Sequence, residues 1–447
     1  MDSLIVRSER VVSPDGVRPA SVHIADGRIA AIAAYADVPS GVRLLDAGPH
    51  MLLPGLVDTH VHINDPGREE WEGFEHATKS AAAGGVTTLV DMPLNSIPPT
   101  TDVRALEAKR AAANGRCHVD VGFWGGVVPG NVDSLEPLAR AGVLGFKCFL
   151  CPSGVDEFEH VSEKDLRAAL PVLSRLRLPL LAHSELPALL NGRAAGDPRR
   201  YATWLESRPP ASEHAAIDLL VRLAREYDAA VHIVHLASSD ALSSLQAART
   251  AGARVTTETC PHYLTFAAED IPDGATAFKC APPIRSRAHR EGLWRGLADG
   301  VIDLVATDHS PAPPSLKRLD SGDFVQAWGG IASLQIGLSA VWTGASARGF
   351  SIEDVVRWMC RTPARLAGLE ARKGAIAPGK DADLVVWDPE AESIVDPAAL
   401  YHRHSVTPYA GLRLRGRVVT TLVRGETVLR EGRFAPGPLG QALRRIH

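Results

Sequence analysis

The chain has 447 residues, of which 45% are hydrophobic and 22% charged, and its formal net charge is −4. This length exceeds one average domain but accommodates a barrel of ~250 residues or more with a smaller appendage. The composition is typical of a soluble globular protein, and the charge gives no electrostatic reason to bind nucleic acid or a membrane surface. We therefore expect the partner to be a small, roughly neutral molecule.

The N-terminal segment Met1–Val6 lacks the basic region and long apolar core of a secretory signal. Nowhere does the sequence approach the ~18 consecutive apolar residues that would predict a membrane span. The six cysteines are scattered without zinc-ribbon spacing, and disulfides are not expected in so long a chain without a secretion signal. These features predict a cytoplasmic location.

Both ends of the chain have the pattern of short β-strands. A hairpin turn is expected at Asp26-Gly27, and a second turn at Arg424-Gly425. The expected strands are Ser3–Arg7, Val22–Ile24, Arg28–Ile32, Asp383–Trp387 and Arg417–Arg424. We predict that residues 1–51 and 374–447 form one composite β-sandwich domain.

The middle of the chain alternates apolar strands with amphipathic helices such as Asp102–Asn114 and Ser162–Arg175. The expected strands are Gly55–Ile63, Thr87–Met92, Val119–Phe123, Gly145–Leu150, Pro179–His183, Ala230–Leu236, Arg254–Thr259 and Asp303–Thr307. Eight strands with intervening helices predict an α/β fold, a (β/α)8 TIM barrel over residues 52–373. An open doubly wound sheet is the alternative, and no glycine-rich phosphate loop supports it.

Two histidines end the first expected barrel strand, in Asp58-Thr59-His60-Val61-His62. Residues two apart on a strand face the same side, so His60 and His62 should both point into the barrel mouth. Imidazoles placed in this way can share one metal ion. The alternative, a pair of surface histidines, fits poorly beside the apolar segment that precedes them.

Lys147 lies in the middle of the apolar strand Gly145–Phe149. Burial of an ammonium is costly and favours the neutral amine, particularly beside metal cations. A neutral amine can take up carbon dioxide to form a carbamate, whose two oxygens can bridge two cations. A lysine in this position is by itself more often an ordinary one that extends to solvent, so the carbamate on Lys147 depends on its neighbours.

Three further residues of ligand type end later strands: His183, His235 and Asp308. His232 and His235 are three apart and should face opposite ways on a strand, so we expect His235 to face the mouth and His232 to be structural. Strands one, four, five, six and eight thus carry a ligand-type residue at their C-terminal ends, where barrel enzymes have their active sites. We expect these residues to form one metal site.

The His-x-His pair, the strand-four lysine, the two later histidines and the final aspartate resemble the cyclic amidohydrolases. This family includes dihydroorotases, dihydropyrimidinases (hydantoinases) and allantoinases, and the resemblance covers essentially the whole chain. It implies two divalent metals bridged by a carboxylated lysine and a hydroxide, with zinc favoured over cobalt, iron or manganese. By this resemblance His60, His62, Lys147 and Asp308 hold one metal, Lys147, His183 and His235 hold the other, and the enzyme is a homotetramer.

Within the family, the segments Pro66–Phe74, Asp91–Asn95, Phe146–Phe149 and Ala327–Ile331 resemble the allantoinase branch. Dihydroorotases carry an arginine two residues after the second histidine for the substrate carboxylate; Asn64, which stands here, cannot form that charge-assisted pair. Dihydropyrimidinases have a tyrosine shortly after the lysine, and this chain has none there. Hydrolysis of allantoin to allantoate in purine catabolism is the predicted activity, and a dihydropyrimidinase or hydantoinase acting on another cyclic ureide is the alternative.

The resemblance also implies contacts between the substrate and Asn95, Ala281, Ser310 and Gly329. Ala281 replaces a serine common in relatives, which matters little if the contact is made by the backbone. The implied catalytic residue is Asp308, which takes a proton from the attacking hydroxide and delivers it to the leaving ring nitrogen. A noncatalytic scaffold that has lost its ligands is a further alternative, but all six ligand positions are filled here.

Overall fold

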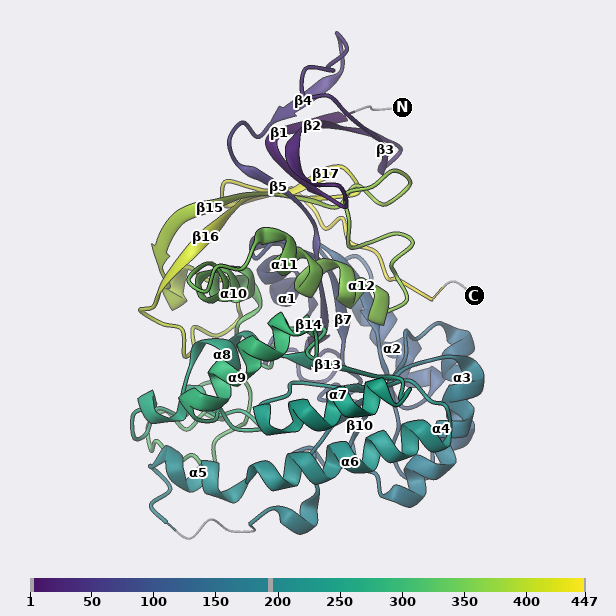
Figure 1. The fold of residues 1–447 in the computed structure, drawn as a ribbon, viewed down its shortest axis with the longest axis vertical. Helices are drawn as coiled ribbons and strands as arrows, with labels where there is room; N and C mark the ends of the chain where they lie inside the picture. Colours follow the sequence, from purple (N-terminus) through teal and green to yellow (C-terminus); the bar gives the residue numbers. More distant parts are fainter. Residues whose placement is uncertain (1–3, 192–195, 446–447) are drawn as a thin grey trace.

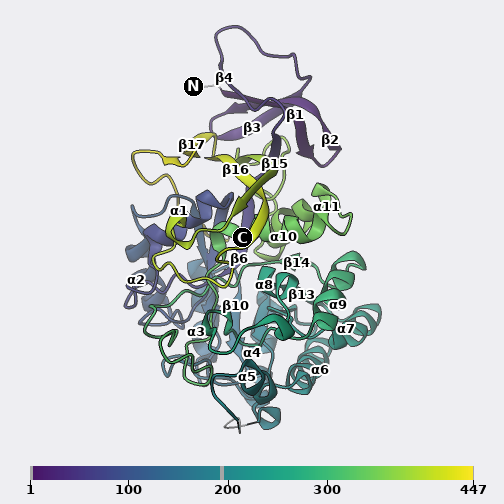
Figure 2. The same cartoon turned by 90° about the vertical axis from the view of Figure 1, so that its left-hand side faces the viewer.

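The computed structural model describes residues 4–191 and 196–445, so Ser3 of the first expected strand lies outside the described residues. A nine-stranded sheet at one end of the molecule combines strands from the two ends of the chain (Figures 1 and 2). Its strands are β1 (Leu4–Ser13), β2 (Gly16–Ala25), β3 (Arg28–Ala33), β4 (Arg43–Asp46), β5 (Met51–Pro54), β15 (Leu384–Ile394), β16 (Arg413–Val423), β17 (Glu426–Arg430) and β18 (Arg433–Phe434). The predicted β-sandwich from both termini is confirmed.

The two ends of the chain join where β5 lies between β1 and β15 in this sheet. Strands β5 and β15 are antiparallel, with Leu53 opposite Val385. Alternate side chains such as Val6, Val22 and Leu384 pack into one buried apolar cluster. The period-two alternation of these strands therefore buries one face and fixes their register.

Below this sheet, eight parallel strands form the barrel (Figure 1). They are β6 (Leu56–Val61), β7 (Val86–Asp91), β8 (Asp120–Phe123), β10 (Phe146–Phe149), β11 (Leu180–His183), β12 (Val231–Ile233), β13 (Val255–Thr259) and β14 (Leu304–Val305), with the short β9 (Gly125–Gly126) after β8. A hydrogen bond from Leu144 N to Phe123 O and a parallel bridge between Val61 and His309 join the two groups of strands into a closed barrel. The predicted α/β fold with a TIM barrel is confirmed.

Helices surround the barrel on its outer side (Figures 1 and 2). They are α1 (Phe74–Ala83), α2 (Val103–Ala113), α3 (Val132–Ala141), α4 (Glu163–Leu176), α5 (Tyr201–Ser207), α6 (Pro210–Glu226), α7 (Leu242–Thr250), α8 (Pro261–Thr265), α9 (Arg287–Ala298), α10 (Gly337–Ser346), α11 (Ile352–Val356) and α12 (Thr362–Leu366). Ser162 begins α4 with a capping box to Asp165, which satisfies backbone N–H groups of its first turn. Within residues 4–191 and 196–445, no helix is long and apolar enough to cross a membrane.

Several barrel strands are shorter than the sequence predicts because the chain turns at their C-terminal ends. Strand β6 ends at Val61 and β12 at Ile233, where Ile63 and Leu236 were expected. Asn64, Asn95, His235 and Asp308 all have positive φ, between 39° and 67°. This backbone conformation is rare outside glycine and concentrates at functional sites. Here it marks the rim on which the polar side chains gather.

Candidate active site

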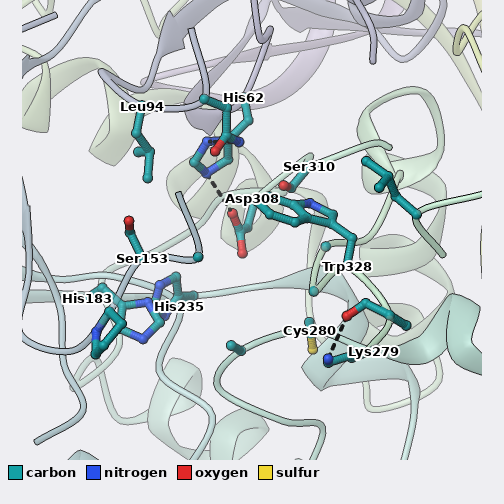
Figure 3. A pocket seen from close by; sticks show the side chains of 18 of the residues that line it. His62, Leu94, Ser153, His183, His235, Lys279, Cys280, Asp308, Ser310 and Trp328 are labelled. Atoms are coloured by element: carbon teal, nitrogen blue, oxygen red, sulfur yellow. Dashed lines mark hydrogen bonds and ion pairs between the residues drawn. The ribbon is translucent and has the colours of Figure 1, made fainter. Parts of the chain in front are cut away.

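A cavity of about 280 Å³ opens at the C-terminal ends of the barrel strands. Five of the six predicted metal ligands line it: His60, His62, His183, His235 and Asp308. Figure 3 shows Asp308 between His62 and the His183–His235 pair, with Trp328 and Lys279 on the other side of the cavity. The structure thus brings together residues that are separated by up to about 250 positions in the chain.

His60 is oriented by a carboxylate behind it. His60 Nδ1 lies 2.5 Å from Oε1 of Glu258, a residue of β13. Burial raises the pKa of Glu258, but the opposite effect of His60 and His232 is larger and brings the pKa down to about 2. An ionised carboxylate only accepts hydrogen bonds, so Nδ1 carries the proton and Nε2 keeps its lone pair. That Nε2 faces Asp308, with Oδ1 at 3.1 Å.

Asp308 follows β14 and reaches into the cavity, where it meets both histidines of the first strand. Its Oδ1 lies 3.1 Å from His60 Nε2 and 3.4 Å from His62 Nε2 (Figure 3). Burial raises the pKa of Asp308, but the electrostatic effect of the adjacent His60 ring and a hydrogen bond from His62 hold it below its usual range. Asp308 is therefore an ionised carboxylate at the centre of the site. Its oxygens can bind a metal ion or accept a proton.

Lys147 lies on β10 beneath the cavity, between Phe146 and Cys148, whose side chains pack in the apolar core. It is fully buried, and its Nζ has no hydrogen-bond partner in the described part of the chain. Burial lowers its pKa to about 8, against the opposing charges of Asp308 and Glu258. A buried nitrogen without partners costs free energy unless another group completes it. This is the chemistry expected of a lysine that is modified or that lies beside bound ions.

His183 ends β11 and has its own carboxylate partner, Glu185. His183 Nε2 lies 2.7 Å from Glu185 Oε2, and Arg208 pairs with the same carboxylate at 2.6 Å. Burial lowers the pKa of His183, but Cys151 and Glu185 raise it more, to about 9. Because Nε2 is held by Glu185, Nδ1 is the nitrogen that a metal ion would bind, in place of its proton. The ring also stacks on Phe149, with ring centroids 4.6 Å apart.

His235 lines the cavity as expected, but the expectation that His232 faces the opposite way is wrong. His232 points into the barrel, where its Nε2 lies 2.9 Å from Glu258 Oε2. The period-two argument fails because β12 ends at Ile233 and His235 has a φ of 39°. His232 and His60 therefore share Glu258, and His235 lies beside His183, with ring centroids 4.6 Å apart.

The four predicted substrate contacts, Asn95, Ala281, Ser310 and Gly329, all line the cavity. The side-chain amide of Asn95 lies 3.4 Å from His62 Nδ1. A Cβ added to Gly329 would lie 3.9 Å from Ala281 N, so these two backbone segments are adjacent. A substrate in the cavity would therefore meet the predicted metal-binding residues on one side and exposed backbone on the other.

Sequence reasoning missed the carboxylates that orient the histidines, above all Glu258 and Glu185. Both are fully buried. Glu258 stands in the strand Val255–Thr259, so it could have been recognised by the argument that singled out Lys147, since an ionisable residue inside a barrel strand requires a partner. Its partner His60 is 198 positions away, and sequence spacing alone does not reveal such a pair.

Comparison with known proteins agrees with this geometry. The family model described as "Amidohydrolase family" matches residues 51–428. An allantoinase of Streptomyces avermitilis is 53% identical over 443 residues, covering 99% of this chain and 98% of that protein. An allantoinase of Arabidopsis thaliana is 46% identical over 458 residues, covering 98% of this chain and 90% of that protein. The chain belongs to the amidohydrolase family.

Among solved structures, the L-hydantoinase (dihydropyrimidinase) of Arthrobacter aurescens superposes with a TM-score of 0.94 at 32% identity, and the match covers all of both chains. Membership of the amidohydrolase family implies divalent metal ions. The donor set fits them: His60, His235 and Asp308 place ligand atoms within 4.8 Å of one another, and carboxylates fix the His60 and His183 rings.

Proposed function

We propose that the protein is an allantoinase, which opens the cyclic amide of allantoin to give allantoate in purine catabolism. The observation that carries this proposal is the cavity in which His60, His62, His183, His235 and Asp308 converge over the buried Lys147. Several full-length relatives named allantoinase, from bacteria to plants, support the choice within the family.

The proposed metal set has two parts. His60, His62, Lys147 and Asp308 would hold one divalent ion, and Lys147, His183 and His235 the other. Lys147 would be N6-carboxylated. Its Nζ has no hydrogen-bond partner among the described residues, and a carbamate there would supply oxygen ligands for both ions. Zinc is the proposed metal, since imidazole and carboxylate ligands suit it, although cobalt, iron and manganese accept the same donors.

Bound divalent ions would polarise the amide carbonyl and lower the pKa of water. The chain itself supplies the proton transfer and the orientation. Asp308 would accept the proton that the attacking water loses and deliver it to the ring nitrogen that leaves, so the same carboxylate oxygen acts as base and then as acid. Glu258 and Glu185 would keep His60 and His183 in one orientation throughout.

Two residues at the barrel mouth, Asn64 and Phe149, support allantoin over other rings. Asn64, which replaces the dihydroorotase arginine, is buried, and its Nδ2 lies 3.5 Å from Pro311 O, so no cation awaits a substrate carboxylate there. Phe149 presents an aromatic face stacked on His183 and no hydroxyl for a dihydropyrimidine. The substrate would meet Asn95, Ser310 and the backbone of Ala281 and Gly329.

The test is a hydrolysis assay on one metal-loaded preparation with allantoin, unsubstituted hydantoin, dihydrouracil and dihydroorotate. We expect kcat/KM for allantoin to exceed the values for hydantoin and dihydrouracil by at least about tenfold, because a pocket built for a polar substituent discriminates against its absence. A higher kcat/KM for dihydrouracil, or for a 5-substituted hydantoin without the ureido group, would establish the dihydropyrimidinase alternative.

The homotetramer and the cytoplasmic location are likewise proposals, made from the sequence. Light scattering on the purified protein tests the first, with a mass about four times that of the 47.7 kDa chain as the expected result. A monomer or dimer at working concentration would contradict it. Fractionation of the source cells tests the second.

A further inference from the structure

Two lysines without carboxylate partners lie beside the substrate cavity. Lys279 and Lys317 are 4% and 3% exposed, respectively. In the described part of the chain their Nζ atoms pair with backbone carbonyls and with no acidic side chain. Neither residue is among the predicted metal ligands or substrate contacts. Because burial of an ammonium is costly, their position needs an explanation.

Lys317 uses all three of its N–H donors on one small group of carbonyls. Its Nζ lies 2.7 Å from Gly330 O, 3.0 Å from Trp328 O and 3.3 Å from Lys279 O. An ammonium has three donors and no acceptor, so these contacts complete it. An apolar side chain at position 317 would leave the carbonyls of Trp328 and Gly330 without this donor.

Lys279 fastens the same loop from the cavity side. Its Nζ lies 3.0 Å from Val325 O and 2.5 Å from Ala327 O, and 4.2 Å from the centroid of the Trp204 ring. Its own backbone closes the arrangement, because Gly330 N donates to Lys279 O at 2.9 Å. Figure 3 shows Lys279 next to Cys280 and opposite Asp308 across the cavity.

One contact of Lys317 and one of Trp204 decide how two peptide planes are turned. A trans peptide directs its N–H opposite to its C=O, so the bond from Lys317 to Trp328 O turns the N–H of Gly329 away from Lys317. Trp204 Nε1 donates to Cys280 O at 3.0 Å and so turns the N–H of Ala281 in the same manner. Gly329 and Ala281 are the two backbone positions that line the cavity next to each other.

We propose that Lys279 and Lys317 are positioning residues that fix the pocket wall, Ala327–Gly330, against the segment Lys279–Ala281, so that the backbone of Ala281 and Gly329 meets the substrate ring in one geometry. The role rests on the proposed function, since it assigns these two backbone positions to substrate binding. The lysines do not touch the reacting atoms. They act through the wall, whose contacts with the ring are made alike before and during the reaction, so a displaced wall should raise KM more than it lowers kcat.

The test compares Lys317→Met and Lys279→Met with Lys164→Met, a control on the exposed face of α4, in metal-loaded enzyme. We expect each of the first two to raise KM by about tenfold or more while kcat changes less than about threefold and the metal content stays at the wild-type level. Lys164→Met should match the wild type. An unchanged KM, or a fall in kcat in step with lost metal, would overturn the proposal.

Should the methionine variants fail to fold, hydrogen exchange on the wild-type enzyme decides the question. The amides of Trp328 and Gly330 should exchange slowly, since both donate backbone hydrogen bonds that hold the wall in place. Exchange as fast as that of exposed loops would overturn the proposal. The outcome is separate from that of the proposed function, because KM can be measured on whichever ring the wild type hydrolyses and exchange requires no substrate.

Discussion

Two fully buried lysines, Lys147 at the barrel mouth and Lys373 at the junction with the terminal sheet, have opposite surroundings. Lys373 Nζ lies 2.7 Å from Asp120, 3.0 Å from Asp381 and 2.6 Å from Asp383. Lys147 Nζ has no hydrogen-bond partner in the part of the chain that the structure describes. Burial lowers the pKa of both, but the three carboxylates reverse the shift for Lys373, whereas that of Lys147 falls to about 8.

The comparison teaches that burial of a charge does not by itself identify a functional residue. The carboxylates around Lys373 come from β8 and from the segment before β15, so this cluster joins the barrel to the terminal sheet and is complete within the protein. The surroundings of Lys147 are incomplete, and they lie under a cavity that a ligand can enter. A missing partner at such a position points to chemistry.

The largest expected effect is that of Lys147→Ala. Loss of the proposed bridge should remove the metal and lower turnover below about 10⁻⁴ of the wild-type value, because the polarising ions and the water they activate are lost together. Short-chain carboxylic acids should restore part of both, since they can occupy the place of the carbamate. Metal analysis and turnover on the same sample check this, and full occupancy with near-normal turnover would show that the bridge is assigned wrongly.

Asp308→Asn should have the next largest effect. An amide cannot relay a proton, so we expect kcat to fall by ~10²–10⁴-fold while much of the metal remains, held by the histidines and Lys147. Steady-state kinetics with elemental analysis separates the two roles of Asp308. Turnover close to that of the wild type would remove Asp308 from the proton-transfer step.

Lys373→Met should act on stability and leave the chemistry of the folded enzyme intact. Three buried carboxylates would lose their shared cation, at a cost of about 3–5 kcal/mol in the free energy of unfolding. Lys79→Met is the matched control, because Lys79 pairs with Glu75 on the surface and should cost no more than about 1 kcal/mol. Denaturant unfolding measures both. Equal costs for Lys373→Met and Lys79→Met would contradict the contrast between Lys373, whose charge is paired within the protein, and Lys147.

The pH dependence of this contribution follows from its sign. The folded pKa of Lys373 is raised: burial lowers it, and the charges of Asp383, Asp120 and Asp381 raise it more. Its stabilisation is therefore fully present below the unfolded pKa of about 10.4 and is lost as pH rises through the higher folded value. The difference in stability between the wild type and Lys373→Met should stay constant between neutral pH and about pH 9, which unfolding at several pH values would check.

Glu258→Gln should have a smaller effect than the substitutions of Lys147, Asp308 and Lys373. The amide would still occupy the space between His60 and His232, but its single oxygen can accept from only one of the two rings, and its NH2 would face the other. Partners of this kind typically change metal affinity by about 10–100-fold. Competition with a chelator measures the affinity. An unchanged affinity would show that Glu258 does not orient His60.

Sequence patterns predicted the barrel because its strands are short apolar runs, several of which end in a polar residue. His60, Lys147, His183 and Asp308 could be selected for the same reason: each is an ionisable group at the end or in the middle of such a run. The inward position of His232 could not be predicted, because the left-handed turn at His235 breaks the alternation on which the argument depended.

Contacts between distant segments were also beyond the reach of sequence reasoning. Glu185 binds Arg208 across a loop, and Lys317 binds carbonyls on both sides of Gly329. Neither pairing has a periodic pattern or a fixed spacing. A single sequence shows which residues are costly to bury, but only the fold shows which of them are left without partners.

The metal content of the barrel mouth is the most direct test of the proposed site. Elemental analysis of the wild-type protein, prepared with bicarbonate and a divalent metal and then freed of loosely bound ions, measures it. We expect about two divalent ions per chain, and fewer when bicarbonate is excluded during loading, because the carbamate on Lys147 needs carbon dioxide. A protein that binds no divalent metal under these conditions would contradict the account.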